Sequence, residues 1–457
     1  MNRAIVWFRR DLSLEDNQGW SLATTTAAEV IPTVVLDDRL LDAAGPFRRT
    51  QYLASVGALA QSITECGGAL TVLSGDPAIA LADLARELSA DAVMWNGDVT
   101  RFARDRDSVT ARRLRAGGVV VDTAWSTLVH PPRSVLTAAG TVSRVFTPYY
   151  RRWSDRPLAG HAEPGSATVL GVERDALPAH PDPPQAAGER AALTRLEQFQ
   201  DHVDDYEHTR DRPDLNLTAR ISADLRFGVI SPRVVVRAIG DSTPGRRAFV
   251  RQLAWRDWYA HLFAANPDLV DHCQQPAYEH IAWQDDPEEF AAWTAGVTGY
   301  PIVDAAMREL AATGWMHNRL RLITASFLVK DLLVDWRWGE QHFRRLLVDG
   351  DVPQNAGNWQ WCAGTGPDAA PYFRVMNPIA QARRWDPDGA YVRRWLPELG
   401  LIPGAAVHAP WELGPLELAA AGVVLGDTYP GPIVDHAVAR DRALAAYGAA
   451  RAAAPSG

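Results

Sequence analysis

Cysteine is scarce in this chain of 457 residues, and the few cysteines are scattered. Cys66, Cys273 and Cys362 are odd in number and far apart, which excludes a disulfide framework and a zinc site built on cysteines. No run of about 18 apolar residues occurs, so we expect no membrane-spanning helix. The short apolar stretch AIVWF near the N-terminus predicts a strand and not a signal peptide. These absences favour a soluble cytoplasmic protein.

Lysine is almost absent as well, since Lys330 is the only lysine among 46 basic residues. Nearly all positive charge is therefore arginine, whose planar guanidinium makes bidentate contacts with phosphate. The net charge of -9 argues against non-specific coating of a polyanion, although a local basic patch can still bind phosphates. Tryptophan is abundant by contrast, with 17 residues of which most lie at or after Trp255. Most of these indoles should pack in a core, and some could serve base stacking or electron transfer.

The N-terminal part of the chain alternates short apolar runs with helical patterns such as 77–89. This alternation predicts a doubly wound parallel α/β sheet, although no GxGxxG fingerprint supports a dinucleotide-binding fold. The runs that we interpret as buried strands are 4–8, 31–36, 69–73, 92–95 and 118–122.

Proline-rich sequence then separates this part from a helical one. Residues 155–190 are punctuated by prolines among alanine, glycine and acidic residues, which predicts a long connector on the surface. From about 191 to 400 the apolar residues recur with a helical period, and a last helix is expected at about 433–452. The predicted fold class is therefore α/β plus all-α. The predicted domains are an α/β domain over 1–130, a connector over 131–195 and a helical domain over 196–457.

The segment Asp349–Trp361, DGDVPQNAGNWQW, crowds carboxylates, amides and indoles into a few residues. Asp349 and Asp351 flank one glycine, and this spacing allows a general acid/base pair or ligands of a hard cation. A metal is disfavoured, because no third carboxylate or histidine joins them in the loop. We therefore expect no metal site.

Three further segments combine polar and aromatic side chains. In RQLAWRDWYAHL, one helical face carries Gln252, Trp255, Arg256 and Tyr259. Such a face suits a flat aromatic or nucleobase ligand, although an amphipathic core helix has the same pattern. In TGWMHNRLRL, a helix would place Trp315, Asn318 and Leu322 on one face with Arg319 beside them, around either a polar cavity or a core. The segment TARIS, residues 218–222, could bind an anion or simply cap a helix.

Several long segments resemble the photolyase/cryptochrome flavoproteins, and most closely the microbial class I enzymes that repair cyclobutane pyrimidine dimers. They follow the family's order across almost the whole chain: WFRRDLSLEDN, TGYPIVDAAMREL, TGWMHNRLRLITASFLVKDLL, DWRWGE, DGD, NWQW and TGPDAAPYFRVMNP. The resemblance implies an antenna-binding α/β domain, a connector and a helical domain that binds FAD and DNA. It implies a deoxyribodipyrimidine photo-lyase, in which light-excited FADH⁻ lends an electron to a flipped-out dimer.

The resemblance assigns flavin contacts to the segments described above. Arg321 and Asp349 match a salt-bridged pair beside the flavin ring, and Asp351 matches an acceptor at the ring edge. Asn355 matches the residue that faces flavin N5, where an amide favours reduced flavin. Ala219 stands where the family has serine, so one side-chain contact is expected to be missing. The expected FAD contacts are Tyr206, Thr218, Ala219, Arg220, Ile221, Ser222, Arg321, Asp349, Gly350, Asp351 and Asn355.

The resemblance also assigns residues to electron transfer and to the lesion. Trp359, Trp336 and Trp283 match a chain that carries an electron from the surface to the flavin, and with Asn355 and Gln252 they make up the expected catalytic set. We expect UV-damaged DNA as the partner, and a monomer that associates with the nucleoid when bound to damage. The expected contacts with DNA or lesion are Arg210, Gln252, Trp255, Arg256, Tyr259, Asn318, Arg319, Leu322, Trp361, Arg374 and Gln381.

Two positions depart from the dimer-repair pattern. Gln252 replaces a glutamate that hydrogen-bonds the dimer, and Leu322 replaces a methionine. Enzymes for (6-4) photoproducts carry glutamine at the first position, but they need histidines where Asn318 and Leu322 stand. We therefore expect cyclobutane-dimer repair at reduced efficiency. The alternatives are a cryptochrome-like blue-light photoreceptor with little or no repair activity, and a plain flavin-binding or electron-transfer protein.

An antenna pigment is also expected. The segment WNGDVTRFARDRD resembles the pigment region of enzymes that use 8-hydroxy-5-deazaflavin. Asp98, Arg49 and Arg9 are the candidate contacts, and methenyltetrahydrofolate is the alternative pigment.

Overall fold

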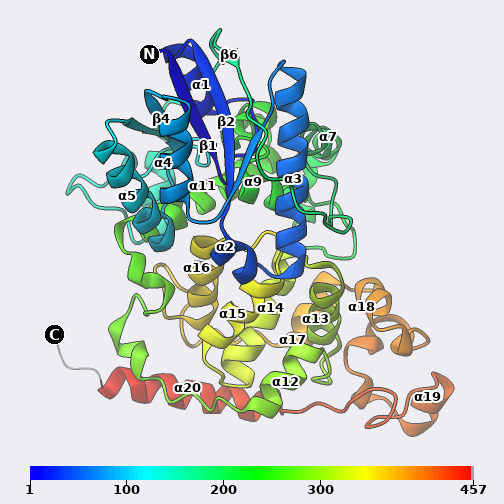
Figure 1. Ribbon diagram of the computed structural model, residues 1–457. Coiled ribbons are helices and arrows are strands. Elements are labelled where there is room, and N and C mark those ends of the chain that lie inside the picture. The colour runs from blue at the N-terminus through cyan, green and yellow to red at the C-terminus, as the bar shows by residue number, and fades with distance from the viewer. Residues whose placement is uncertain (454–457) are drawn as a thin grey trace. The chain divides into compact units, whose positions relative to one another are not determined.

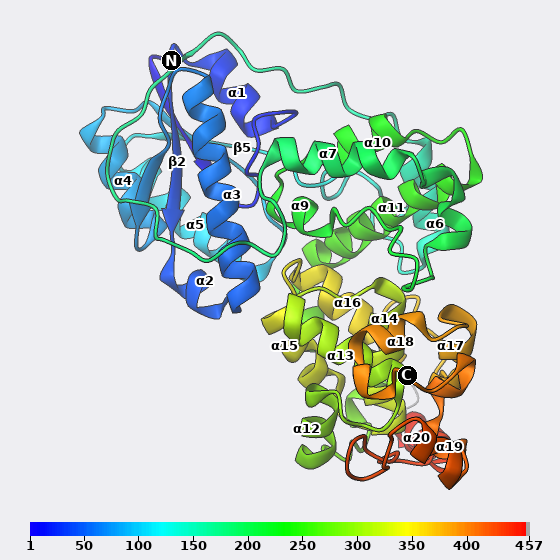
Figure 2. The same ribbon diagram turned by 90° about the vertical axis from the view of Figure 1, so that its right-hand side faces the viewer.

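The computed structural model describes residues 1–453, which divide into two compact units. Unit 1 comprises residues 1–207, 219–267 and 348–353, and unit 2 comprises residues 208–218, 268–347 and the chain from 354 onward. Figures 1 and 2 show the elements of each unit from two sides. These units follow other boundaries than the predicted ranges 1–130, 131–195 and 196–457, so those domain ranges stay a prediction.

Unit 1 is built around a parallel β-sheet (Figure 1). The strand order is β3-β2-β1-β4-β5, and a short β6 pairs with the start of β2. The predicted doubly wound sheet is confirmed, and the ends of its predicted strands shift by no more than two residues. The strands are β1 (Arg3–Phe8), β2 (Glu29–Leu36), β3 (Thr71–Ser74), β4 (Ala92–Asn96), β5 (Val120–Ala124) and β6 (Thr168–Val169).

Helices cover the sheet, which explains why its strands are apolar without alternation. Residues Ala4–Phe8 of β1, for example, are all fully or nearly fully buried. The helices of unit 1 are α1 (Gln18–Thr26), α2 (Asp38–Ala43), α3 (Pro46–Glu65), α4 (Pro77–Glu87), α5 (Arg101–Ala116), α6 (Phe146–Asp155), α7 (Glu189–Gln200), α9 (Ser222–Phe227), α10 (Pro232–Ile239) and α11 (Pro244–Ala265).

The strand order reverses between β1 and β4, which is the topological switch point of this sheet. In open α/β sheets, ligands bind in the crevice that forms there at the carboxyl ends of the strands. The loop after β1 leads to α1, which Asn17 caps by accepting a hydrogen bond from the amide of Trp20. The loop after β4 leads to α5, which Thr100 caps in the same way from the amide of Ala103. Both loops therefore present polar residues at one edge of the sheet.

The proline-rich stretch lies mostly at the surface, as expected, whereas the connector bounds 131–195 stay a prediction because α6 and the start of α7 fall within them. Between α6 and α7 the chain forms no helix, and β6 is its one strand. Most of its residues are exposed or half-buried, and Figure 2 shows this stretch as an extended trace. The prolines and glycines that punctuate it account for the lack of regular structure, since proline cannot donate to a helix or a sheet ladder.

The regular elements of unit 2 are helices, and no named strand lies among its described residues. None of the helices described in either unit has the length and apolar character needed to cross a bilayer. Its main helices are α12 (Pro287–Ala295), α13 (Pro301–Thr313), α14 (Asn318–Ser326), α15 (Trp336–Leu346), α17 (Pro378–Trp385), α18 (Ala390–Trp395), α19 (Pro415–Ala420) and α20 (His436–Ala453). Two helices begin in unit 1 and continue into unit 2: α8 (Tyr206–Thr209) and α16 (Val352–Ala363).

The expectation that one helix places Trp315, Asn318 and Leu322 on one face was wrong. Helix α13 ends at Gly314 in the left-handed conformation with φ of 68°, so no helix runs through Trp315. A left-handed residue with an amide bonded back to the last turn is a common way for a helix to stop. The chain restarts at α14, which His317 caps, and passes through a π-helical turn over Phe327–Asp331. Trp315 thus precedes α14 and does not share a helical face with Asn318 and Leu322.

Candidate functional site

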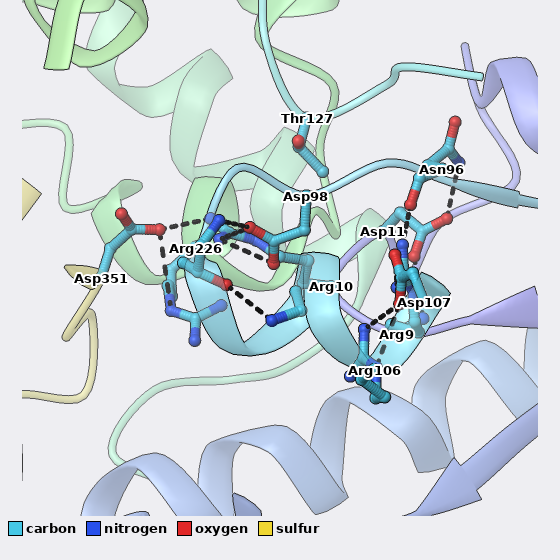
Figure 3. A network of polar contacts seen from close by, with 12 residues as sticks. Arg9, Arg10, Asp11, Asn96, Asp98, Arg106, Asp107, Thr127, Arg226 and Asp351 are labelled. Atoms are coloured by element: carbon cyan, nitrogen blue, oxygen red, sulfur yellow. Dashed lines mark hydrogen bonds and ion pairs between the residues drawn. The ribbon is translucent and has the colours of Figure 1, made fainter. Parts of the chain in front are cut away.

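The Asp349–Asp351 loop lies buried in unit 1, and arginines from two other segments hold it. Arg10 Nη2 forms an ion pair with Asp351. Arg226, from α9, donates from Nε to the carbonyl of Gly350 at 2.9 Å and lies 3.9 Å from the Asp351 carboxylate. Figure 3 draws these residues in one network of polar contacts. The loop is therefore fixed by charge as well as by burial.

Charge decides the ionisation of Asp351. Burial alone would raise its pKa, but the guanidinium groups of Arg10, Arg226 and Arg256 outweigh burial and lower the pKa below the ordinary value. Burial, together with the charge of Arg10, lowers the pKa of Arg226 to about 10. Asp351 is therefore a carboxylate at neutral pH, and a carboxylate can only accept hydrogen bonds. It suits a ligand that presents an N–H group.

The edge of the sheet at the switch point carries more charged residues, shown on the right of Figure 3. Arg9 Nη1 lies 2.5 Å from Asp107 on α5, and its guanidinium sits 4.7 Å from the centre of the Trp7 ring. Asp98 pairs with Arg10 and accepts from the amide of Thr100 at 3.0 Å. The predicted pigment residues Arg9 and Asp98 thus lie at the same edge of the sheet.

Arg49 is placed differently from the other two predicted pigment residues. It lies on α3, its side chain is half exposed, and its nearest acidic partner is Asp42 at 3.9 Å. Its role in pigment binding stays a prediction.

The four residues on the polar face of α11 differ in burial and in partners. Gln252 and Trp255 are half-buried, and the Trp255 indole stacks on Phe146 with ring centres 3.6 Å apart and 11° between planes. Arg256 donates to the backbone carbonyls of Thr127 and Leu225, and the side chain of Tyr259 is buried. The face can therefore offer one stacking ring and one amide, and lesion contacts by Arg256 and Tyr259 stay a prediction.

The segment Thr218–Ser222 leads into α9. Ile221 is the residue before the helix, and no side chain caps the first turn there. Arg220 adopts a left-handed backbone with φ of 50°, and Ala219 and Ile221 are buried. The Thr218 hydroxyl is buried and has no hydrogen-bond partner among the described residues. Because an unpaired buried hydroxyl is costly, this atom fits a polar ligand such as a phosphate. Tyr206 packs its ring against Phe199 and Phe249.

Asn355 lies on α16 in unit 2 with its amide held in one orientation. Its Nδ2 donates to the backbone oxygen of Glu340 at 2.8 Å and to Glu340 Oε1 at 2.9 Å. Glu340, on α15, is buried and also pairs with Arg344 at 3.3 Å. The carbonyl oxygen Oδ1 accepts no hydrogen bond among the described residues. Asn355 therefore offers an acceptor, and sequence reasoning missed Glu340, which holds its amide.

The three tryptophans of the predicted chain differ in burial. Trp359 and Trp336 are buried in unit 2, whereas Trp283 is partly exposed and meets the Tyr447 ring edge-on at 6.1 Å. The Trp359 indole packs on the bare backbone of Gly339, where a Cβ atom would lie 2.1 Å from Trp359 Cη2. Gly339 is one helical turn beyond Trp336 on α15. Burial is thus greater for Trp359 and Trp336 than for Trp283, and the role of the three in electron transfer stays a prediction.

Predicted DNA contacts in unit 2 gather around residues that the sequence did not single out. Arg319 lies 2.8 Å from Asp211 and stacks 4.9 Å from the centre of the Trp385 ring. Arg210 lies 3.9 Å from the same Asp211, and Gln381 accepts from the Trp385 indole at 3.1 Å. Asp211 and Trp385 therefore join this group.

The remaining expected residues of unit 2 are placed as follows. Arg374 and Asn318 are exposed, whereas Leu322 and Trp361 are half-buried. Arg321 donates from Nε to the carbonyl of Met316 at 2.8 Å, and its pairing with Asp349 stays a prediction. None of the described residues forms a group of three or more histidines, cysteines and carboxylates that could hold a metal.

Comparison with known proteins decides the family. A model described as DNA photolyase matches residues 4–167, and one described as the FAD binding domain of DNA photolyase matches residues 249–449. This chain belongs to the DNA photolyase family. The deoxyribodipyrimidine photo-lyase of Agrobacterium fabrum is 40% identical and that of Streptomyces griseus 41%, over 97–98% of each chain. The predicted family, enzyme class and FAD cofactor are therefore confirmed.

Solved photolyase structures share the fold along the whole chain. A bacterial class III photolyase from Agrobacterium tumefaciens has a TM-score of 0.93 at 38% identity, covering 99% of this chain and 98% of that one. A Synechocystis cryptochrome has a TM-score of 0.89 at 29% identity, covering 97% and 99%. An archaeal photolyase from Sulfolobus tokodaii, described with two FAD molecules, has a TM-score of 0.85 at 32% identity and covers 98% and 100%. The predicted fold class is thereby confirmed.

Proposed function

We propose that this photolyase uses blue light and bound FAD to repair cyclobutane pyrimidine dimers in DNA. The observation that carries the proposal is the fixed amide of Asn355, whose Nδ2 is committed to Glu340. The free Oδ1 can accept from the protonated N5 of reduced flavin, whereas the N5 of oxidised flavin is itself an acceptor. When bound and reduced, FAD supplies, after absorbing light, the electron that opens the dimer and later returns. Asn355 thus favours the reduced form of FAD, which is the form that repair requires.

The lesion side of the proposal rests on α11. The indole of Trp255 presents a half-buried ring backed by Phe146, and base stacking on such a ring is worth about 1–3 kcal/mol per base. The Gln252 amide, one turn earlier, can donate to a pyrimidine carbonyl and accept from its N–H. Because an amide is uncharged, its hydrogen bond to a dimer N–H is weaker than the charge-assisted bond of a glutamate carboxylate. We expect repair at reduced efficiency as a result.

The DNA contacts in the proposal come from arginines. Arg319 and Arg210 share Asp211, and Arg374 is exposed. Phosphate contacts of this kind position the backbone without reading sequence, which suits an enzyme that must act wherever a dimer forms. We propose that the enzyme acts as a monomer, and its elution volume with and without damaged DNA tests that.

A pigment site belongs to the proposal as well. Arg9 Nε, Arg10 Nε and Trp7 Nε1 are buried and have no hydrogen-bond partner within residues 1–453. Such donors at a switch point support an acceptor-bearing pigment, and we propose 8-hydroxy-5-deazaflavin with methenyltetrahydrofolate as the alternative. Reconstitution with each pigment, followed by energy transfer to flavin, distinguishes the two. Transfer from the folate alone would contradict the first choice.

The central test is repair of a defined lesion. The purified protein is reduced without oxygen, mixed with DNA that carries one cyclobutane thymine dimer, and illuminated with blue light beside a dark control. A (6-4) photoproduct runs in parallel. Light-dependent loss of the cyclobutane dimer alone is expected. Flavin photoreduction without any repair would overturn the proposal and favour the blue-light photoreceptor, for which the likeness to the Synechocystis cryptochrome is the supporting observation.

Electron supply is tested separately on the oxidised protein. Trp336→Phe should slow flavin photoreduction by at least tenfold, since phenylalanine is far harder to oxidise than tryptophan. Trp338→Phe is a matched control, because Trp338 lies on the same helix but packs edge-on to Phe290. Equal rates in the two variants would remove Trp336 from the electron path.

A further inference from the structure

One guanidinium in unit 1 serves two buried carboxylates. Arg10 Nη2 pairs with Asp351, while Nη1 lies 3.3 Å from Asp98 Oδ2 and 3.4 Å from Oδ1. All three side chains are at most 14% exposed. Arginine can bridge in this way because its planar fork presents separate N–H groups to separate acceptors. Arg10 is therefore a shared partner, as Figure 3 shows.

The two carboxylates belong to different functional regions. Arg10 follows β1 and Asp98 follows β4, so both lie at the switch point where the pigment is proposed. Asp351 belongs to the loop that is proposed to meet the flavin. Among the described residues, Arg10 therefore forms an ion pair with a carboxylate of each region.

The surrounding charges show what would be lost without Arg10. Arg226 lies 3.9 Å from Asp351, and its Nε–H donates to the carbonyl of Gly350. Asp98 would keep the amide of Thr100. Asp351 would keep only the longer ion pair with Arg226, and Asp98 would keep no ion pair that compares with the one to Arg10. A buried carboxylate whose pairing is weakened in this way is disfavoured. The two aspartates would also repel each other, an effect that the cation between them now offsets.

We propose that Arg10 is a positioning residue that sets the Asp351 carboxylate for the flavin, and that Asp98 acts on the flavin through Arg10. The inference rests on the proposed flavin contact of Asp351. An acceptor-bearing ligand at the switch point would compete for the same guanidinium, so its binding and flavin binding are coupled. Such coupling is reciprocal and typically amounts to about 5–150-fold in affinity.

The test measures FAD affinity and the flavin midpoint potential of the holoprotein in the dark, without DNA. Arg10→Gln should weaken FAD binding at least tenfold and lower the potential, because a cation beside the anionic reduced flavin is gone. Asp98→Asn should raise the potential, because an anion is gone and Arg10 then serves Asp351 alone. The control is Arg86→Gln, an exposed arginine of the same unit that pairs with Asp83. It should match the wild type in both measurements.

Arg10→Lys separates positioning from charge. Lysine keeps the positive charge but is a point charge without a planar fork, so it cannot bridge both carboxylates in the same way. The potential should stay near that of the wild type, while FAD affinity falls at least fivefold. Wild-type affinity in this variant would overturn the bridge. Should Arg10→Gln fail to fold, by circular dichroism, the Lys and Asn variants still decide the matter.

The outcome is independent of repair. Unchanged FAD affinity and potential in folded Arg10→Gln would refute the inference even if the wild type repairs dimers. The expected shifts without any dimer repair would leave the inference standing and refute the proposed function instead.

Discussion

Lys330, the only lysine, is buried at 1% exposure in the π-helical turn of unit 2. Its ammonium donates to the carbonyl of Ala363 at 3.1 Å and lies 3.4 Å from the centre of the Tyr447 ring. Burial lowers its pKa from 10.5 to about 7, because it outweighs the opposing attraction of Cys362. We predict that Lys330→Met has a higher unfolding free energy than the wild type near pH 7, and that this difference becomes smaller as the pH rises.

The magnitude follows from the pKa shift. A fall from 10.5 to about 7 corresponds to about 5 kcal/mol of disfavoured charge. The unfolded chain binds a proton between these two pKa values and the folded protein does not, so stability rises with pH across that window. Below about pH 7 the whole cost is present in the wild type. Lys330→Met has no such cost, so it should be the more stable protein there.

The assay is urea unfolding of both proteins at several pH values. The advantage of Lys330→Met should shrink by about 2 kcal/mol between about pH 7 and about pH 9. Other titrating groups are common to the two proteins and cancel in the difference. Lysine labelled with ¹⁵N reports the same titration directly, because only one side chain carries the label. A difference that stays flat across this range, or a measured Lys330 pKa near 10.5, would refute the reasoning.

Three further changes have expected outcomes. Gly339→Ala drives a Cβ atom to 2.1 Å from the Trp359 ring, which should cost about 1–3 kcal/mol in unfolding free energy and slow flavin photoreduction in flash photolysis. Glu340→Ala removes one of the two acceptors that orient Asn355, so reduced flavin should reoxidise several-fold faster in air, followed by its absorbance. Gln252→Glu should raise the quantum yield of cyclobutane-dimer repair, because it restores a carboxylate that can hydrogen-bond the dimer.

Each of these changes has a control or a contrary outcome. Gly448→Ala is the matched control for the glycine, since a Cβ there meets nothing within 4 Å on helix α20. For Glu340→Ala, a reoxidation rate equal to that of the wild type would mean that the backbone oxygen alone orients Asn355. An unchanged repair yield in Gln252→Glu would show that position 252 does not limit repair.

The sheet was predictable because its strands are short apolar runs bounded by turn residues. The run 31–36, for example, lies within β2. The proline-rich connector between α6 and α7 contains no helix, as its composition predicts. The break at Gly314 was not predictable from periodicity. Apolar residues continue on both sides of it, and only the left-handed backbone of this glycine ends the helix there.

The site was predictable only where a motif carries it. Asp351 and Asn355 stand out in the sequence, and both lie in polar surroundings. Their partners Arg10 and Glu340 lie in the segments WFRRDLSLEDN and DWRWGE, but neither segment shows which residue they pair with. Arg10 lies 341 residues from Asp351, and Glu340 reaches Asn355 from a neighbouring helix. Long-range ion pairs of this kind appear only once the chain has folded.

The pairing of Arg10 with Asp351 can form only late in the synthesis of the chain. At roughly 5–20 residues per second, about 20–70 s pass between the synthesis of Arg10 and that of Asp351. During this time the nascent N-terminal sheet holds an arginine at its edge without its later partner. Unit 1 therefore cannot reach its final state as an early, independent product of translation. A chain that stops before residue 348 would keep all the strands yet lack the segment that completes them.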